Sequence, residues 1–134
     1  EYSNHSQRVI KKFQAMINND GIIPEEFKIK KFSQRLLQKK WGEKGPSITV
    51  TSLPDDFVHF SQARSLSVRE LARIQTFPDW YRFAGKRTTG GIRRAGNPRA
   101  NIFDRDVPKY TQIGNAVPVK LAEAIGKHLL KLLS

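Results

Sequence analysis

The stretch at residues 64–83, RSLSVRELARIQTFPDWYRF, obeys more local structural rules than any other part of the chain. Ser67 followed three positions later by Glu70 is a capping-box sequence, in which the hydroxyl accepts from the third helical amide and the carboxylate accepts from the cap amide. A mainly apolar face then recurs at helical spacing, with two arginines left for the outer side: Val68, Leu71, Ala72, Ile74 and Gln75, against Arg69 and Arg73. We predict a short capped helix that ends at Phe77-Pro78, because a residue before proline is pushed out of the helical region. We expect this helix to hold the aromatic residues of the following turn in a core: Trp80, Tyr81 and Phe83.

A second stretch, residues 110–118 (YTQIGNAVP), leads into the most regular apolar pattern of the chain. Asn115 is a strong N-cap residue and Pro118 is tolerated in a first turn, so we predict that the last helix begins at Asn115 and runs to Leu133. Its apolar stripe is continuous: Val117, Leu121, Ala124, Ile125, His128, Leu129 and Leu132. Gly126 costs about 1 kcal/mol relative to alanine inside a helix, which indicates close packing against a neighbour. The stripe requires a broad apolar partner surface, wider than we expect the rest of this chain to offer.

Together, and in this order, the two stretches resemble the last two signature blocks, motifs IX and X, of the DNA (cytosine-5) methyltransferases. The pattern R-x-L-[ST]-x-R-E-x-A-R-x-Q-x-F-P-D is matched throughout residues 64–79, and Q-x-G-N-[AS]-V-P throughout residues 112–118. The resemblance covers roughly residues 47–133. It implies the C-terminal part of a bacterial-type enzyme, which would be cytoplasmic and of the restriction–modification kind.

In this family a large α/β domain holds S-adenosylmethionine and the catalytic groups, a smaller domain recognises DNA, and the target cytosine is swung out of the duplex. The resemblance therefore implies S-adenosyl-L-methionine as cofactor, double-stranded DNA as substrate, and a catalytic large domain or subunit as partner. Carried over by motif, the cofactor-binding residues are Gly114, Asn115, Ala116 and Val117. Backbone amides at a helix start fit this role, because they can receive the carboxylate of the methionine moiety.

The chain contains no cysteine, which removes disulfides, cysteine metal sites and any thiol nucleophile. Cytosine-5 methylation, as the family performs it, needs a thiolate that attacks the ring. The family's Pro-Cys, Glu-Asn-Val and Phe-x-Gly-x-Gly blocks are also absent from this sequence. We therefore expect no catalytic residue here and no activity from this chain alone. It would be either the smaller subunit of a split enzyme or a fragment of a longer chain.

The chain is strongly basic, with 24 Lys and Arg against 12 Asp and Glu and a formal net charge of +12. This excess of positive charge favours nucleic acid as the partner, with an anionic membrane surface as the second candidate. No apolar run in the sequence approaches the roughly 20 residues that are needed to span a bilayer. The basic run at residues 28–44 is either a solvated face or a set of phosphate contacts. The Gly/Arg-rich segment at residues 85–99 either contacts the DNA backbone or merely links the two blocks. The candidate DNA-binding residues are Arg35, Lys39, Lys86, Arg87, Arg93 and Arg94.

Periodicity and turn residues predict three further elements: a helix at residues 6–18, capped by Asn4 or Ser6 and ended by residues 18–21; a helix after Pro24; and a strand at residues 47–52. His59 lies in a short apolar piece at residues 57–60, with no second ligand at a metal-like spacing. We interpret it as a packed or solvent-edge histidine, and we predict no metal site.

The predicted fold class is mixed α/β: a small-domain remnant plus a C-terminal helix that would pack on the large S-adenosylmethionine-binding α/β domain. Residues 1–46 would be the end of a target-recognition region, residues 47–109 a small-domain segment with motif IX and the basic Gly/Arg loop, and residues 110–134 motif X and the C-terminal helix. Two other classes explain the charge: a non-enzymatic DNA-binding protein with a helix-turn-helix around Ser67, and a basic RNA-associated structural protein. Neither explains why Gln-Ile-Gly-Asn-Ala-Val-Pro follows.

Overall fold

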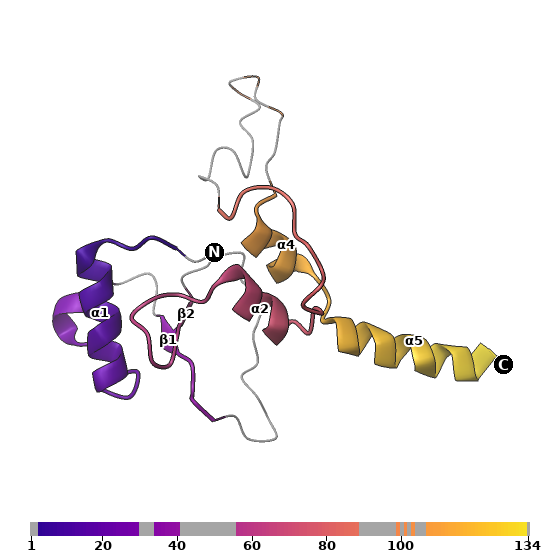
Figure 1. Ribbon diagram of the computed structural model, residues 1–134, viewed down its shortest axis with the longest axis horizontal. Helices are drawn as coiled ribbons and strands as arrows, with labels where there is room; N and C mark the ends of the chain where they lie inside the picture. The colour runs from indigo at the N-terminus through magenta and orange to yellow at the C-terminus, as the bar shows by residue number, and fades with distance from the viewer. Residues whose placement is uncertain are drawn as a thin grey trace.

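The computed structural model describes residues 3–29, 34–40, 56–88, 99, 101, 103 and 107–133. In chain order, its elements are α1 (Gln7–Asn18), the 3-10 turn η1 (Glu25–Phe27), β1 (Arg35–Leu36), β2 (Phe57–Val58), α2 (Val68–Ile74), α4 (Lys109–Asn115) and α5 (Val119–Leu133). Strands β1 and β2 pair in parallel. Figure 1 shows α1 at one end of the molecule, α2 and α4 in the middle, and α5 extending from the other end. At this coarse level the mixed α/β prediction is confirmed.

Helix α1 confirms the predicted helix at residues 6–18, with Ser6 at the cap position but without a side-chain cap hydrogen bond. Its Phe13 and Met16 are fully buried beside Val58 of β2. The helix ends as predicted, through Asp20 and Gly21 in the left-handed region. A side chain on Gly21 would begin 3.2 Å from the Leu36 Cβ, so glycine also lets this turn approach β1 closely.

The predicted helix after Pro24 is wrong for residues 25–29, where only the three-residue turn η1 forms. None of the three residues of η1 is buried, so no apolar contact favours a longer helix there. The predicted strand at residues 47–52 lies outside the described residues. The apolar piece at residues 57–60 supplies the short strand β2.

Helix α2 carries both hydrogen bonds of the predicted capping box, from the Ser67 side chain and from Glu70. The helix ends at Ile74, before the predicted stop at Phe77-Pro78. The cause is Thr76, which adopts a φ of 61°. Its amide donates to the Arg73 carbonyl, and the Phe77 amide donates to the Ala72 carbonyl. These two bonds are those of a Schellman ending, with threonine in the position that glycine usually takes.

The prediction for the aromatic turn is only partly correct. Phe77 and Phe83 pack against the core, whereas Tyr81 is 40% exposed and Trp80 is 75% exposed. The Tyr81 amide donates to the Pro78 carbonyl and so closes a tight turn, which carries Trp80 at its outer side. Trp80 is therefore a surface residue.

The prediction of one helix from Asn115 is wrong. Asn115 is the last residue of α4, and a separate helix, α5, begins at Val119. Ala116 between them is extended, with a ψ of 144°. Pro118 explains the break, because it disfavours helical geometry in the residue before it. Pro118 therefore lies before the second helix rather than inside its first turn.

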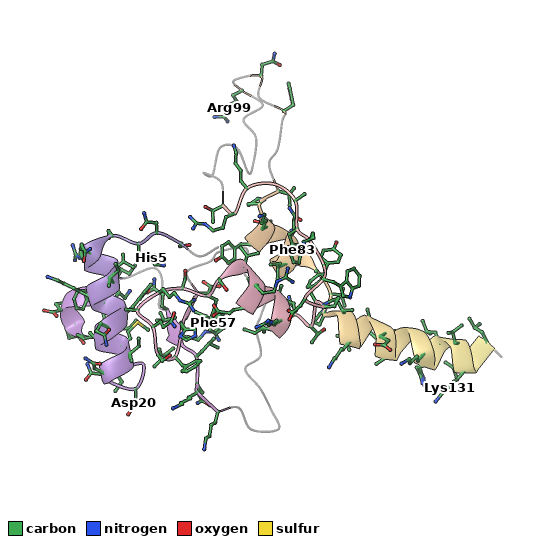
Figure 2. The ribbon with its side chains drawn as sticks, in the orientation of Figure 1. His5, Asp20, Phe57, Phe83, Arg99 and Lys131 are labelled. Atoms are coloured by element: carbon green, nitrogen blue, oxygen red, sulfur yellow. The ribbon has the colours of Figure 1, made fainter. Side chains whose placement is uncertain are left out.

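Helix α5 buries none of its residues in this chain. Its apolar residues Leu121, Ile125, Leu129 and Leu132 are each about half or more exposed. Figure 2 shows the helix, with Lys131 near its far end, extending away from the rest of the molecule. A Cβ placed on Gly126 would meet nothing within 4 Å, so the close packing predicted there is absent within this chain. No helix among the described residues could cross a membrane.

Candidate functional site

The two matched stretches meet in the core through Gln75, the residue that follows α2. Gln75 is 3% exposed, and its Nε2 donates to the Ile113 carbonyl at 3.2 Å and lies 3.5 Å from the Ala116 carbonyl. Both carbonyls belong to the end of α4, which packs beside α2 (Figure 1). Sequence reasoning placed Gln75 on the apolar face of α2 and missed this contact. The available signal was a lone amide side chain among buried apolar positions.

The end of α2 also caps the start of α5. The Val119 amide donates to the Gln75 carbonyl at 3.2 Å, and the Lys120 amide donates to the Thr76 Oγ1 at 2.9 Å. A threonine at positive φ is strained, and here its hydroxyl satisfies an amide that a helix start leaves open. Sequence reasoning missed Thr76, for which no local signal exists.

The four predicted cofactor residues form the end of α4 and the link to α5. Gly114 is buried inside α4, Ala116 is half-buried, and Asn115 and Val117 are exposed. The helix-start argument for these residues is incorrect, since Asn115 ends a helix and the first two amides of α5 already have partners. The link between α4 and α5 exposes the amide side chain of Asn115 and the apolar side chain of Val117.

An ion pair anchors the start of α2. Arg64 donates from Nη1 and Nη2 to the two carboxylate oxygens of Glu70, both at 2.8 Å, and the Ser67 amide donates to the same carboxylate. The Arg64 hydrogen bonds, followed by those from Ser67, outweigh burial and lower the pKa of Glu70 to about 2. Glu70 is therefore ionised throughout the physiological range and fixed as the acceptor of this network.

His59 is buried next to this ion pair, which confirms the packed alternative over the solvent-edge one. Its Nδ1 accepts from the amides of Ser61 and Gln62, both at 3.2 Å. Burial and the Arg64 charge lower its pKa, against the opposing effect of Glu70. The ring is therefore neutral at physiological pH, and because Nδ1 is an acceptor, the proton is on Nε2. Among the residues that the structure describes, no cluster of His, Asp or Glu could hold a metal ion.

The structure places the basic candidates in two separate groups. Arg35 and Lys39 are exposed on and after β1, and the Arg35 guanidinium lies 4.7 Å from the centre of the Phe57 ring. Lys86 is exposed and Arg87 half-buried beside α4, whose first residues, Lys109 and Tyr110, donate main-chain amides to their carbonyls. The remaining candidates, Arg93 and Arg94, lie outside the described residues.

Comparison with known proteins gives a consistent result along most of the chain. The model of the C-5 cytosine-specific DNA methylase family matches residues 1–131. The chain is 33% identical over 135 residues to the type II methyltransferase M1.HphI of Haemophilus parahaemolyticus, covering 98% of this chain and 31% of the relative. It is 31% identical over 138 residues to the type II methyltransferase M.DdeI of Desulfomicrobium norvegicum, covering 93% and 30%.

A shorter and closer match is to the type II methyltransferase M.BspRI of Lysinibacillus sphaericus, with 47% identity over 66 residues, 49% of this chain and 13% of the relative. The chain thus spans less than a third of the length of these three relatives. No solved structure gave a significant match.

Proposed function

Because the chain belongs to the C-5 cytosine-specific DNA methylase family, we propose that it is the C-terminal portion or subunit of a DNA (cytosine-5) methyltransferase. In this proposal it contributes DNA binding and part of the S-adenosylmethionine pocket, and the cysteine nucleophile comes from elsewhere. Its lack of cysteine and its match to about 30% of two longer methyltransferases both support this division.

The observation that carries the proposal is the contact between the two matched stretches. The buried Gln75 side chain binds the end of α4, and the Thr76 hydroxyl binds the start of α5. These bonds hold residues 114–117 in a bend at the molecular surface, where Asn115 is exposed. A surface bend fixed from both sides suits a pocket that a second domain completes.

The residues of the bend fit one edge of an S-adenosylmethionine site. Asn115 offers an amide that can donate to and accept from polar groups of the cofactor, and Val117, 60% exposed, offers an apolar contact beside it. When bound, the cofactor supplies the methyl group. The contribution of this chain would be to bind and orient the cofactor.

Helix α5 is the proposed contact with the catalytic domain. Four of its large apolar side chains, Leu121, Ile125, Leu129 and Leu132, repeat at helical spacing and lie in water in this chain. An extended apolar face of this kind marks a surface that another protein surface covers. In this proposal a large α/β domain, carried by another subunit or another part of the same protein, covers it.

DNA binding would use the excess of positive charge. Arg35 and Lys39 near β1, Lys86 and Arg87 beside α4, and the arginines Arg93 and Arg94 are the proposed phosphate contacts. The net charge of +12 supports an affinity for a polyanion that falls as salt rises.

The alternative of a helix-turn-helix protein finds less support. In the described residues after α2 an aromatic turn follows, with no second helix three or four residues later.

The test is methyl transfer from labelled S-adenosylmethionine to mixed-sequence DNA, with this chain alone and with a cysteine-bearing large-domain chain from the same genome. Activity only in the mixture would support the proposal. Activity from this chain alone would refute the assignment of the nucleophile to a partner.

The variant Asn115→Ala separates the proposed roles. In the assembled enzyme it should weaken S-adenosylmethionine binding and leave assembly intact, because the Asn115 side chain is exposed. A plain DNA-binding module would show no methyl transfer with or without the large-domain chain, while still binding DNA.

A further inference from the structure

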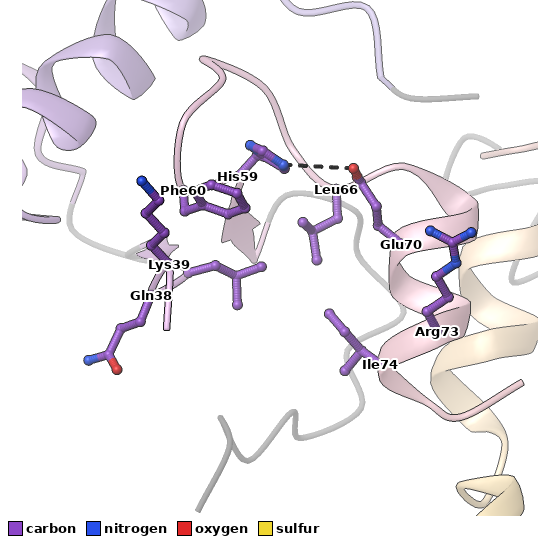
Figure 3. A pocket seen from close by; sticks show the side chains of 9 residues that line it. Gln38, Lys39, His59, Phe60, Leu66, Glu70, Arg73 and Ile74 are labelled. Carbon is purple, nitrogen blue, oxygen red and sulfur yellow. Dashed lines mark ion pairs between the residues drawn. The ribbon is translucent and has the colours of Figure 1, made fainter. Parts of the chain in front are cut away.

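A pocket of about 350 Å³ lies between the segment after β1, the turn after β2 and one side of α2 (Figure 3). We call it the β1–α2 pocket and define it by Leu37, Lys39, His59, Phe60, Leu66 and Ile74, which line it. Its volume falls within the range of small-ligand sites, roughly 300–1,000 Å³. The proposed function assigns a role to Lys39 alone among these residues.

The His59 ring gives this pocket a hydrogen-bond donor of fixed identity. Two main-chain amides donate to Nδ1, which leaves the ring proton on Nε2. Glu70 Oε1 lies 3.8 Å from His59 Nε2, beyond hydrogen-bonding distance; the dashed line in Figure 3 joins these two side chains. His59 lines the pocket, so an acceptor atom of a ligand there could take a hydrogen bond from this donor.

The remaining walls divide by chemistry. Leu37, Leu66 and Ile74 make an apolar side, and the Phe60 ring stacks on the His59 ring with their centroids 4.3 Å apart. Phe60 is 36% exposed, which leaves aromatic surface open at the mouth. Two charged residues, Glu70 and Arg73, also line the pocket, and each is already in an ion pair, with Arg64 and Asp79 respectively. Lys39, exposed at the rim, adds a positive charge.

We propose that the β1–α2 pocket takes one unstacked base of the bound DNA. A base is planar and apolar on its faces, carries acceptor atoms on its edge, and is attached to a phosphate. Those three features match the Phe60 and leucine surfaces, the His59 Nε2–H and the Lys39 ammonium. A free phosphate would leave the apolar side unused, and an aliphatic ligand would leave the His59 donor unsatisfied. A stacked base cannot enter such a hollow, so the ligand is a base that has left the duplex.

This inference rests on the proposed DNA binding, and its test separates the two. The full chain is titrated with a labelled, perfectly paired duplex and with the same duplex carrying one unpaired thymine. Base–aromatic stacking predicts that the bulged duplex binds about fivefold or more tightly than the paired one. Equal affinity for the two duplexes would overturn the pocket assignment and leave DNA binding standing. Failure to bind either would refute the proposed DNA binding and the pocket together.

Two neighbouring lysines provide a matched pair of variants. Lys39 lines the pocket and Lys40 does not, and both are exposed. Lys39→Gln and Lys40→Gln remove the same charge and should weaken binding of the paired duplex equally. Only Lys39→Gln should reduce the preference for the bulge. An equal preference in both variants would contradict the proposal.

Two further variants test the ring system itself. His59→Asn keeps an acceptor for the amides of Ser61 and Gln62 and removes the Nε2–H, and Phe60→Leu removes the aromatic face. Both should lower affinity for the bulged duplex to that of the paired one, with an unchanged circular dichroism spectrum. Millimolar thymidine monophosphate should also shift the His59 Nε2–H resonance in the wild-type chain. A bulge preference that survives both variants, or an unmoved resonance, would overturn the assignment.

Discussion

Replacing Glu70 by glutamine should destabilise the fold at neutral pH and have little effect in strong acid. Glutamine can still close a capping box, because its amide oxygen accepts from the Ser67 amide. It carries no charge, so the two 2.8 Å contacts with Arg64 become weaker hydrogen bonds. The variant therefore isolates the contribution of the ion pair from that of the cap.

The magnitude follows from the Glu70 pKa, which falls from 4.5 to about 2 on folding. A shift of about 2.5 units corresponds to about 3 kcal/mol at 1.36 kcal/mol per unit. The Glu70 side chain is 32% exposed, and solvent screening reduces this to roughly 1–2 kcal/mol. Because the folded pKa is the lower one, the stabilisation is complete above about pH 4.5 and is lost as the pH falls through about 2.

The measurement is urea unfolding followed by far-ultraviolet circular dichroism, at about pH 7 and again near pH 2. The control is Asp79→Asn, which removes an exposed partner of Arg73 and should change little, since both side chains of that pair are over half exposed. The reasoning fails if Glu70→Gln is as stable as this control at neutral pH. It also fails if the free-energy difference between Glu70→Gln and the wild-type chain is the same at both pH values.

Three other variants test separate parts of the structure. Tyr110→Phe removes the bond to the Leu66 carbonyl, which is 2.5 Å long and buried, and should lower the free energy of unfolding by about 1–2 kcal/mol in urea titrations. Gly126→Ala should raise the free energy of unfolding by about 0.5–1 kcal/mol, because nothing lies within 4 Å of the added Cβ; a lower one would show that this helix face is already covered. Arg93→Ala combined with Arg94→Ala should lower DNA affinity and flatten its logarithmic salt dependence by about 2, and an unchanged slope would remove these arginines from the DNA interface.

Local rules predicted those parts of the fold whose causes are local. The capping box of Ser67 and Glu70 lies within four residues, and its two bonds form as expected. The same holds for the end of α1, where Asp20 and Gly21 take the left-handed conformation. The packed state of His59 follows from its apolar neighbours in sequence. In each case the residues that determine the conformation are adjacent in the chain.

The errors have two different origins. The break between α4 and α5 was predictable, because the rule applied to Phe77-Pro78 also applies to the residue before Pro118. The early end of α2, which the conformation of Thr76 causes, was not predictable, because the Thr76 hydroxyl accepts from the amide of Lys120, 44 positions away. The exposure of Trp80 was likewise not predictable from neighbouring residues. Its turn is held by Arg69, which donates to the Tyr81 carbonyl at 2.8 Å across twelve residues.

Three polar side chains of the two matched blocks bind main chain, and this limits where a ligand site can lie. Gln75 donates to the Ile113 carbonyl, Tyr110 to the Leu66 carbonyl, and Gln112 to the carbonyls of Ala84 and Val107. Each of these groups is occupied in joining one segment to another, so it has little capacity left for a cofactor or for DNA. The recognition groups that we propose are those left open by these bonds: the bend at residues 114–117, the apolar stripe of α5, the β1–α2 pocket and the basic side chains outside the core. An interlocked core of this kind holds those surfaces in fixed positions relative to one another, which a site shared between two domains requires.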